Sequence, residues 1–575
     1  MSRHALRILP LALFATIAAN AGAAPPTQDA PFVWSSVVDN GDYMPTNTCD
    51  PTAITATSPP CRYFNSYNQP SVNASGLVVF RARSQGGHGA GEPVHGIYTR
   101  DMGAAGPVVR ILERGSPVPQ PNNLGTVFHE PPSFPRIDIG SPTIVTRGNH
   151  QPVWQVDGNV EDQVGTNGVY ANPFGPLVTG TSKLGALGDF SFFQVPESPG
   201  TFFDVFPGAP AVTDRNVIVF KGNYTVDLVG KTGVYYRTLT DAPIPYAGGD
   251  LLPAAGTSPL VLIANNTDTL IPGTQTVFGS TAPPSAANHM AVFAGFDNED
   301  APTRGGIYLA PLNGSQPALT TLVSIGQQVP EENADARFNR LGEGVSFDGR
   351  FVAFWGAWGT AMKSLVLQCP HEGNAERVAY CHEQFPDGAS VQVPLQQGIF
   401  VVDTELREIH PIAKAPADYD DFLYWNFSGH VPGSTQEEDG EPARWRSAAF
   451  VAVTTTVNAK RKLNLMTAFQ ARTGVVQDGA YVDPVDGIYL KRRSDTSPML
   501  TVAETGMAGT RLDARAVDAV TGAPLPITDV GIERDGFRGN YLVINARMGP
   551  EETGWAGIYF TDVSINEGIF ANGFE

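Results

Sequence analysis

The sequence predicts an all-β fold, a seven-bladed β-propeller, and three observations lead to this prediction. The chain of 575 residues holds 61 Gly and 48 Pro, which punctuate turns and disfavour long helices. Short apolar runs bounded by Gly, Asn or Asp recur along it, as at 77–80, 217–220 and 541–544. A motif of Gly, then Ile or Val, then an aromatic residue occurs seven times. Such a chain consists of many short strands joined by tight turns.

The repeated unit is built around the Gly-aromatic motif. Its seven copies begin at Gly96, Gly168, Gly233, Gly306, Gly398, Gly487 and Gly557. An apolar strand introduced by a turn precedes several copies, as in 70–80 and 348–354. After most copies another apolar strand follows, most clearly at 108–119, 322–330 and 499–506. Each unit is therefore predicted to be a small antiparallel meander.

The two ends of the repeat region complement each other. The last unit ends near Val563 without a closing strand, whereas the segment 32–45 is an unattached copy of that strand. An N-terminal strand that completes the last blade closes a propeller and protects its strand edges. An open solenoid is the alternative, although in such a fold the N-terminal strand would not need to pair with the last unit.

The first unit resembles a known repeat family. Its segment 73–80, NASGLVVF, followed by the Gly-Ile-Tyr motif, resembles the NxxGxxAF tandem repeats of exported bacterial proteins of the choice-of-anchor type. Later units depart from this pattern and carry Asp214 or Asp348 near the place of the Asn. The tail 569–575 is similar to the IFxxGFE endings of secreted proteins of some Gram-negative bacteria. The resemblance implies export and a propeller-like fold, and it implies no reaction.

The N-terminal segment has the three parts of a signal peptide. Arg3 and Arg7 precede the apolar run 8–19, and Ala21-Gly22-Ala23 matches the A-x-A cleavage motif. We expect a signal peptide over 1–23 cleaved after Ala23, one propeller domain over 24–563, and a tail over 564–575 that holds a sorting motif. No later run approaches the roughly 20 apolar residues of a spanning helix. We therefore expect a protein that is secreted, periplasmic or at the cell surface.

Four cysteines form two pairs of equal spacing, Cys49 with Cys61 and Cys369 with Cys381. Four cysteines permit three connectivities, of which local pairing is the simplest. Disulfides persist in oxidising compartments, which agrees with export. A metal site is the rival interpretation, but the sequence has no C-x-x-C spacing.

The net charge of −20 excludes partners bound through their phosphates, because nucleic-acid affinity depends on Lys and Arg. No cofactor is predicted, although Asp297, Glu299 and Asp300 offer oxygen ligands for calcium. These residues lack the order of a calcium loop, and a solvated turn is the alternative. We expect a monomer.

Two units are longer than the rest. Successive Gly-aromatic motifs lie 72, 65, 73, 92, 89 and 70 residues apart, which places enlarged loops at about 359–397 and 418–480. Loops often carry function. In or beside these two lie the candidate ligand-binding residues Trp355, Trp358, Trp425 and Trp445 and the candidate catalytic residues Tyr424, His382, His430, Arg444 and Arg446.

Two functions fit these residues. Indole rings flanked by charged groups suit carbohydrate, so the first is a binding or surface-interaction module for an extracellular carbohydrate or another envelope component. The second is an extracellular carbohydrate-active enzyme, in particular a polysaccharide lyase, in which Tyr or His removes a proton and Arg stabilises the developing charge. A purely structural envelope protein is a third interpretation. For the indoles, packing between blades is the alternative to ligand binding.

Overall fold

The computed structural model shows how these short strands assemble. It describes residues 27–29, 32–45, 61–84, 93–121, 126–150, 153–157, 160–164, 167–186, 188–245, 251–252, 255–314, 317–371, 374–429, 431–432, 442–457, 463–493, 498–550 and 553–566. The expected signal peptide, Cys49, His430 and the tail from residue 567 lie outside them. No helix in the described ranges has the length and apolar character needed to cross a membrane.

Seven antiparallel sheets carry most of the strands. The first blade contains β3 (Phe64–Tyr67), β4 (Ser71–Val72), β5 (Leu77–Ser84), β6 (His95–Asp101) and β7 (Val108–Glu113), and the second contains β8 (Phe128–Glu130), β9 (Arg136–Ile137), β10 (Ile144–His150), β13 (Asn167–Ala171) and β14 (Val178–Ser182). The third blade contains β15 (Ala211–Thr213), β16 (Val217–Val226), β17 (Val229–Thr238) and β20 (Val261–Asn265). The fourth contains β21 (Ser280–Thr281), β22 (Ser285–Ala287), β23 (Met290–Phe296), β24 (Gly305–Pro311) and β25 (Thr320–Ser324).

The other three blades use segments from both ends of the chain. The fifth blade contains β26 (Phe338–Leu341), β27 (Ser346–Phe347), β28 (Phe351–Leu367), β29 (Ala389–Asp403) and β30 (Ile409–Ala415). The sixth contains β33 (Val451–Val457), β34 (Leu463–Gln477), β35 (Ala480–Arg492), β36 (Met499–Glu504) and the parallel edge strand β1 (Thr27–Asp29). The seventh contains β37 (Ile527–Gly531), β38 (Phe537–Arg538), β39 (Tyr541–Met548), β40 (Trp555–Asp562) and β2 (Ser35–Asp39).

Smaller elements decorate the ring. They are the hairpins β11 (Val153–Asp157) with β12 (Val160–Val164), β18 (Ile244–Pro245) with β19 (Leu251–Leu252) and β31 (Tyr424–Ser428) with β32 (Arg444–Ala448), the helix α1 (Ala375–Gln384), and the 3-10 turns η1 (Lys183–Ala186), η2 (Gly188–Phe193), η4 (Gly509–Arg511) and η5 (Val563–Asn566).

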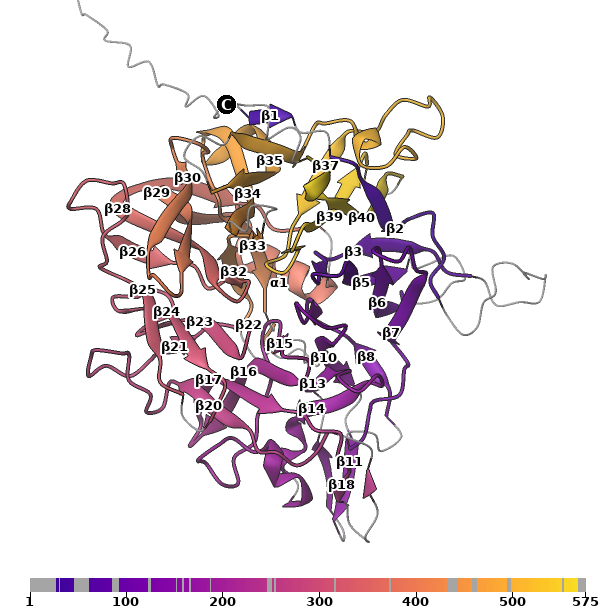
Figure 1. Cartoon of the computed structure of the whole chain (residues 1–575), viewed down its shortest axis with the longest axis vertical. Helices are drawn as coiled ribbons and strands as arrows, with labels where there is room; N and C mark the ends of the chain where they lie inside the picture. The colour runs from indigo at the N-terminus through magenta and orange to yellow at the C-terminus, as the bar shows by residue number, and fades with distance from the viewer. Residues whose placement is uncertain are drawn as a thin grey trace, which may run out of the picture.

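The ring closes as the sequence predicts. β2 pairs antiparallel with β40, with Ser35 opposite Phe560 and Asp39 opposite Gly557, so the N-terminal strand completes the last blade. In Figure 1 the indigo β2 lies beside the yellow β40. Near the axis the inner strands β4, β9, β15, β22, β27, β33 and β38 each lie against the next, and β38 lies against β4. The seven-bladed propeller is thereby confirmed, and the open solenoid is excluded.

The Gly-aromatic motif marks the third strand of each blade and has a steric cause. Side chains two residues apart share one face of a strand, and the aromatic ring folds back over the Gly. In β17 a Cβ on Gly233 would lie 2.6 Å from the Tyr235 hydroxyl, closer than packed atoms approach. Tyr235 stacks on Phe220 with centroids 6.0 Å apart and meets Phe203 edge-on at 5.0 Å. The motif therefore builds the hydrophobic core of the blade seams.

The Asn of the first unit stabilises its own turn and joins two blades. Asn73 Oδ1 accepts hydrogen bonds from Ser75 N (3.0 Å), Ser75 Oγ (2.9 Å) and Leu77 N (2.9 Å). Its Nδ2 donates to the backbone carbonyl of Ser141 in the second blade (3.1 Å). One buried side chain thus satisfies the turn and holds the neighbouring blade in register.

In later units an Asp stands near the place of this Asn and still forms a hydrogen bond to the neighbouring blade. Asp348 Oδ1 accepts from the backbone of Arg350 (2.9 Å) and Phe351 (2.7 Å), while its Oδ2 accepts from Thr455 Oγ1 of the sixth blade (2.7 Å). Asp214 Oδ2 accepts from His289 N of the fourth blade (2.7 Å). Asn73 and Asp348 each use one oxygen for the turn and a second group for the neighbouring blade, so the repeat tolerates either residue, whereas Asp214 Oδ2 accepts from both Thr213 Oγ1 and His289 N.

A buried cluster of charged side chains ties the blades together at the axis. Arg136 of β9 is fully buried and donates to Glu533 and, at 2.8 Å, to Asp535 Oδ2, both in the segment between β37 and β38. Arg538 donates to Asp535 and to the Val453 carbonyl of the sixth blade (2.8 Å). Burial raises the pKa of Glu533 to about 7, although the positive charge of Arg136 acts to lower it.

A second ion-pair cluster joins the first two blades. Arg81 Nη2 lies 2.5 Å and His95 Nδ1 3.2 Å from Glu130 Oε1 at the end of β8. Arg81 Nε also donates to the Pro131 carbonyl (2.5 Å). Burial opposes ionisation of Glu130, but His95 and Arg81 outweigh it and lower the pKa of this carboxyl to about 2.

We predict that Asn73→Ala lowers the free energy of unfolding by about 2 kcal/mol, because a buried turn loses its acceptor and a carbonyl loses its donor. Ser75→Ala, in the same turn but exposed, is the matched control and should cost well under half as much. Urea unfolding followed by tryptophan fluorescence measures both. Equal losses for the two variants would contradict the role given to Asn73.

Glu130 gives a prediction for pH. Folding lowers its pKa from 4.5 to about 2, so its contribution is complete above pH 4.5 and is lost as the pH falls through about 2. At neutral pH Glu130→Gln should therefore lower the free energy of unfolding by up to about 3 kcal/mol, and the difference from the unaltered protein should shrink on acidification. Urea unfolding at successive pH values checks this, with exposed Asp335→Asn as control. A difference that does not change with pH would refute it.

Candidate functional site

The first enlarged loop is a long hairpin closed by a helix. β28 and β29 continue past the blade, with Leu367 opposite Ala389, and α1 lies between them in the chain. Asn374 caps α1 by accepting from Arg377 N (3.0 Å). Cys369 and Cys381 form a disulfide, so one of the two expected local pairs is confirmed. Cys61 is also disulfide-bonded.

The second enlarged loop meets the first. β34 and β35 extend past the sixth blade as a long hairpin, with Gln477 opposite Ala480, and the part before β33 departs from the blade pattern. That part contains the hairpin β31–β32, in which Phe427 stands opposite Trp445. Phe427 is buried with the disulfide, and Trp445, Tyr380 and Phe385 pack around it. We call α1, the disulfide and the β31–β32 hairpin together the cap.

The cap lies over the propeller axis. Figure 1 shows α1 at the middle of the ring, where the inner strands converge. Arg444 of β32 reaches the fourth blade, where it forms ion pairs with Glu299 and, at 2.9 Å, with Asp300 between β23 and β24. The cap therefore spans from the fifth and sixth blades to the fourth. The carboxylates of Glu299 and Asp300, considered as calcium ligands, pair with Arg444, and Asp297 accepts from Thr303 and Arg304.

A dense polar network holds the base of the cap to the sixth blade. Lys363 Nζ lies 3.2 Å from Asp421 Oδ2, and Tyr481 donates to the same oxygen (2.8 Å). Asp421 Oδ1 accepts from Gln397 (3.0 Å), whose own oxygen accepts from Trp355 Nε1 (2.9 Å). All of these polar groups have partners inside the protein. The network is therefore suited to support rather than to catalysis.

The structure places Tyr424 in a second part of this network. Its hydroxyl donates to Asp486 Oδ1 (3.2 Å), and the guanidinium of Arg472 lies over its ring at 5.1 Å while pairing with the same carboxylate. Burial, followed by the charge of Asp486, raises the pKa of Tyr424 well above its usual value of 10. A phenol with a raised pKa is a poor general base at neutral pH.

The four candidate tryptophans separate into two pairs. Trp355 and Trp358 are 5% and 3% exposed and pack in the seams beside the fifth blade, so neither indole face is open to a ligand. This is the packing that the sequence analysis held as the alternative. Trp425 and Trp445 are half-buried in the cap, and the N–H groups of both indoles are buried without an acceptor among the described residues.

The remaining candidates do not form one cluster. His382 is exposed on α1 with its ring 5.9 Å from that of His371, while Arg446 is half-buried and donates to the Pro442 carbonyl (3.4 Å). His430 lies outside the described residues. Within the described residues no group of three or more metal-ligating side chains occurs. The axis charges around Glu533 were not predicted, although a charged triplet at 533–535 within a strand pattern is a usable signal.

We predict that the contact between Arg444 and the fourth blade holds the cap in place. Arg444→Ala should speed hydrogen exchange of the β31–β32 amides severalfold while lowering global stability by under about 1 kcal/mol, because the pair is partly exposed. The double substitution Glu299→Gln with Asp300→Asn should have the same effect. Combining all three should add nothing further. Fully additive effects would show that the ion pairs do not act on the cap.

Comparison with known proteins gives likeness to solved structures at low identity. No family model matches the chain, and no curated protein matches it. Among solved structures, an α-L-arabinanase of Penicillium chrysogenum complexed with arabinobiose is 7% identical with a TM-score of 0.26 over 75% of this chain and 93% of that chain. An α-L-arabinofuranosidase of Fusarium graminearum with an iminosugar inhibitor is 8% identical with a TM-score of 0.27 over 92% and 98%. Likeness at this level carries no argument about reaction or ligand.

Proposed function

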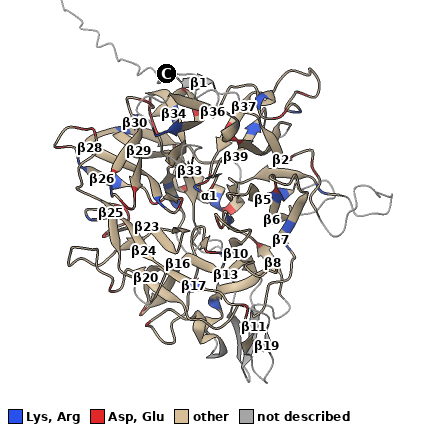
Figure 2. Ribbon diagram, viewed as in Figure 1, with Lys and Arg blue, Asp and Glu red and all other residues tan. Residues whose placement is uncertain are grey.

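We propose that this chain is an exported propeller that binds carbohydrate through its cap. Export is supported by the signal-like N-terminus together with the bonded state of Cys369, Cys381 and Cys61, since disulfides persist in oxidising compartments. A partner bound through phosphate has no support, because Lys and Arg are scattered around the ring instead of gathering on one blade (Figure 2).

The cap carries the proposal because it presents two indoles on one rigid surface. Trp425 and Trp445 share one face of the β31–β32 hairpin, since Trp425 pairs with Ser447 and Trp445 with Phe427. Phe427 lies on the same face, and the disulfide packs there against Phe427 and Trp445. The exposed part of a half-buried indole ring provides an apolar surface on which a sugar ring packs.

The same region favours binding over proton abstraction. A lyase needs a base that is free to take a proton, whereas Tyr424 donates to Asp486 and its pKa is raised by burial. It also needs a cation free to face the substrate, whereas Arg444 pairs with Glu299 and Asp300. A binding surface requires neither group.

We predict that the purified mature protein is retained on at least one member of a panel of neutral and acidic polysaccharides, and that Trp445→Phe weakens retention about fivefold. Phe keeps the contact with the disulfide but removes part of the apolar ring surface, worth about 1 kcal/mol. Trp555→Phe, in the seventh blade, is the matched control and should leave retention unchanged.

The same incubations are followed for ultraviolet absorbance and reducing ends. Unsaturated uronate product that disappears in Tyr424→Phe would replace the binding proposal with the lyase. Loss of retention in both tryptophan variants alike would show that the cap is not the binding surface, and retention on no polysaccharide would refute the proposal.

A further inference from the structure

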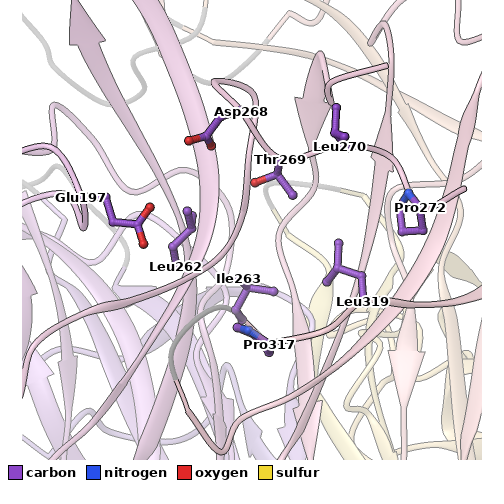
Figure 3. A pocket seen from close by; sticks show the side chains of 9 residues that line it. All are labelled: Glu197, Leu262, Ile263, Asp268, Thr269, Leu270, Pro272, Pro317 and Leu319. Carbon is purple, nitrogen blue, oxygen red and sulfur yellow. The ribbon is translucent and has the colours of Figure 1, made fainter. Parts of the chain in front are cut away.

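A cavity of about 390 Å³ opens at the seam between the third and fourth blades (Figure 3). Apolar side chains make up most of its lining, together with the carboxylates of Glu197 and Asp268. Both of these acidic residues are exposed to solvent. The lining therefore points to no particular ligand, and we assign none to it.

A pair of tyrosines at the surface, beside the closure of the ring, has a more definite chemistry. Tyr43 follows β2, and Tyr63 immediately precedes β3. The two residues stand opposite each other in an isolated antiparallel bridge. Two backbone hydrogen bonds flank this bridge, from Met44 N to the Arg62 carbonyl (2.8 Å) and from Phe64 N to the Asp42 carbonyl (3.1 Å). This is the pattern of a non-hydrogen-bonded pair, in which opposed side chains approach most closely.

The same backbone turns both phenol rings outward. Side chains alternate between the two faces of an extended segment. Met44 and Phe64 are buried in the core between the first and last blades. Their neighbours Tyr43 and Tyr63 therefore lie on the outer face, where Tyr63 is 43% exposed. An oxidant in the surrounding solution can reach the pair.

The two phenols are in direct contact. Tyr63 donates its hydroxyl proton to the Tyr43 hydroxyl oxygen, and the two oxygens are 2.6 Å apart. The ring centroids are 4.2 Å apart, and the ring planes are inclined by 31°. Because the oxygens are closer together than the centroids, the rings converge toward their hydroxyl ends. The ortho carbons, which are bonded to the carbon that carries each hydroxyl, are thereby brought together.

We propose that Tyr43 and Tyr63 form an oxidative modification site, at which a dityrosine crosslink joins an ortho carbon of each ring. The oxidant is hydrogen peroxide, used by a haem peroxidase that removes one electron from each phenol. Each phenol loses its hydroxyl proton with the electron, and the two phenoxyl radicals form a carbon–carbon bond. The hydrogen on each bonded ortho carbon then moves to the oxygen as a proton, which restores both phenols. The two electrons and two protons that were removed reduce one peroxide to two waters.

The geometry favours coupling within one chain. Radicals that the fold holds in contact combine faster than radicals that must meet by diffusion, because folding has already brought them together. The crosslink would fasten the segment after β2, the strand that closes the ring, to the first blade. It uses no residue of the cap and is independent of carbohydrate binding.

A buried tyrosine pair provides an internal comparison. The rings of Tyr419 and Tyr489 have centroids 4.5 Å apart, but the two residues are only 2% and 1% exposed. Proximity alone would couple both pairs. Because the peroxidase must reach a phenol to oxidise it, we expect the crosslink at the surface pair alone.

Treatment of the dilute purified mature protein with a haem peroxidase and limiting hydrogen peroxide tests the proposal. We expect the monomer to lose the mass of two hydrogen atoms and to acquire dityrosine fluorescence, with a yield that does not depend on protein concentration. Trypsin cuts after Arg62 and, once disulfides are reduced, separates the peptide of Tyr43 from that of Tyr63 unless they are crosslinked. The crosslinked peptides together lack two hydrogens, whereas an uncut chain lacks one water.

Variants locate the crosslink. Tyr43→Phe and Tyr63→Phe should each lower the yield at least about tenfold, because Phe keeps the ring but forms no phenoxyl radical and leaves the other tyrosine without its partner. Tyr541→Phe removes another partly exposed tyrosine and should leave the yield unchanged. The proposal is overturned if the monomer gains no crosslink, if either of the first two variants crosslinks like the unaltered protein, or if the linked peptides contain another pair. A yield that falls on dilution would also overturn it, since the bond would then form between chains.

Discussion

Closure of the ring is the constraint on which the rest of the molecule depends. The third strand of the last blade, β40, keeps a free edge unless a fourth strand covers it, and the N-terminal β2 does this by pairing with β40. The same requirement explains the charges at the axis. Arg136 of the second blade reaches Glu533 and Asp535 of the seventh, so a fully buried cation crosses the junction between the two ends of the chain. Buried ion pairs contribute little net stability. We attribute to these pairs the fixing of blade register, since their geometry is satisfied only when the ring is closed.

The sequence of the repeat can vary between units because some of its structural positions can be held by more than one type of residue. Asn73 and Asp348 each supply a turn acceptor that also reaches the next blade, and Asp214 keeps the link to the next blade. The Gly of the Gly-aromatic motif is less replaceable, because a Cβ there would collide with the ring two residues later at five of the copies and with a backbone carbonyl of the next strand at Gly306 and Gly398. This difference explains why the Gly-aromatic motif could be found seven times in the sequence while the Asn was clear only in the first unit.

The sequence was sufficient for the fold and only partly sufficient for the site. Periodicity, the seven glycines and the displaced strand near Ser35 predicted blade number and closure, because each depends on local sterics or on pairing of recognisable strands. The pairing of Cys369 with Cys381 followed from spacing. Burial of Trp355 and Trp358 could not be separated from exposure, because an indole fits a seam as well as a surface. The environment of Tyr424 depends on Asp486, about one blade further along the chain.

The topology of the blades also determines at which end of the ring long insertions can be accommodated. In an antiparallel blade the turn after the first strand and the connection after the third lie at one end of the ring, and the other connections lie at the opposite end. The first of these ends is fixed near the axis by turns that link blade to blade, such as Asn73 with Ser141 and Asp348 with Thr455. An insertion there would break those links. The hairpin that carries α1 and the segment that carries β31–β32 both arise at the opposite end, where no such ring of turns is required. The cap therefore lies at the end of the axis that is opposite the turns linking blade to blade.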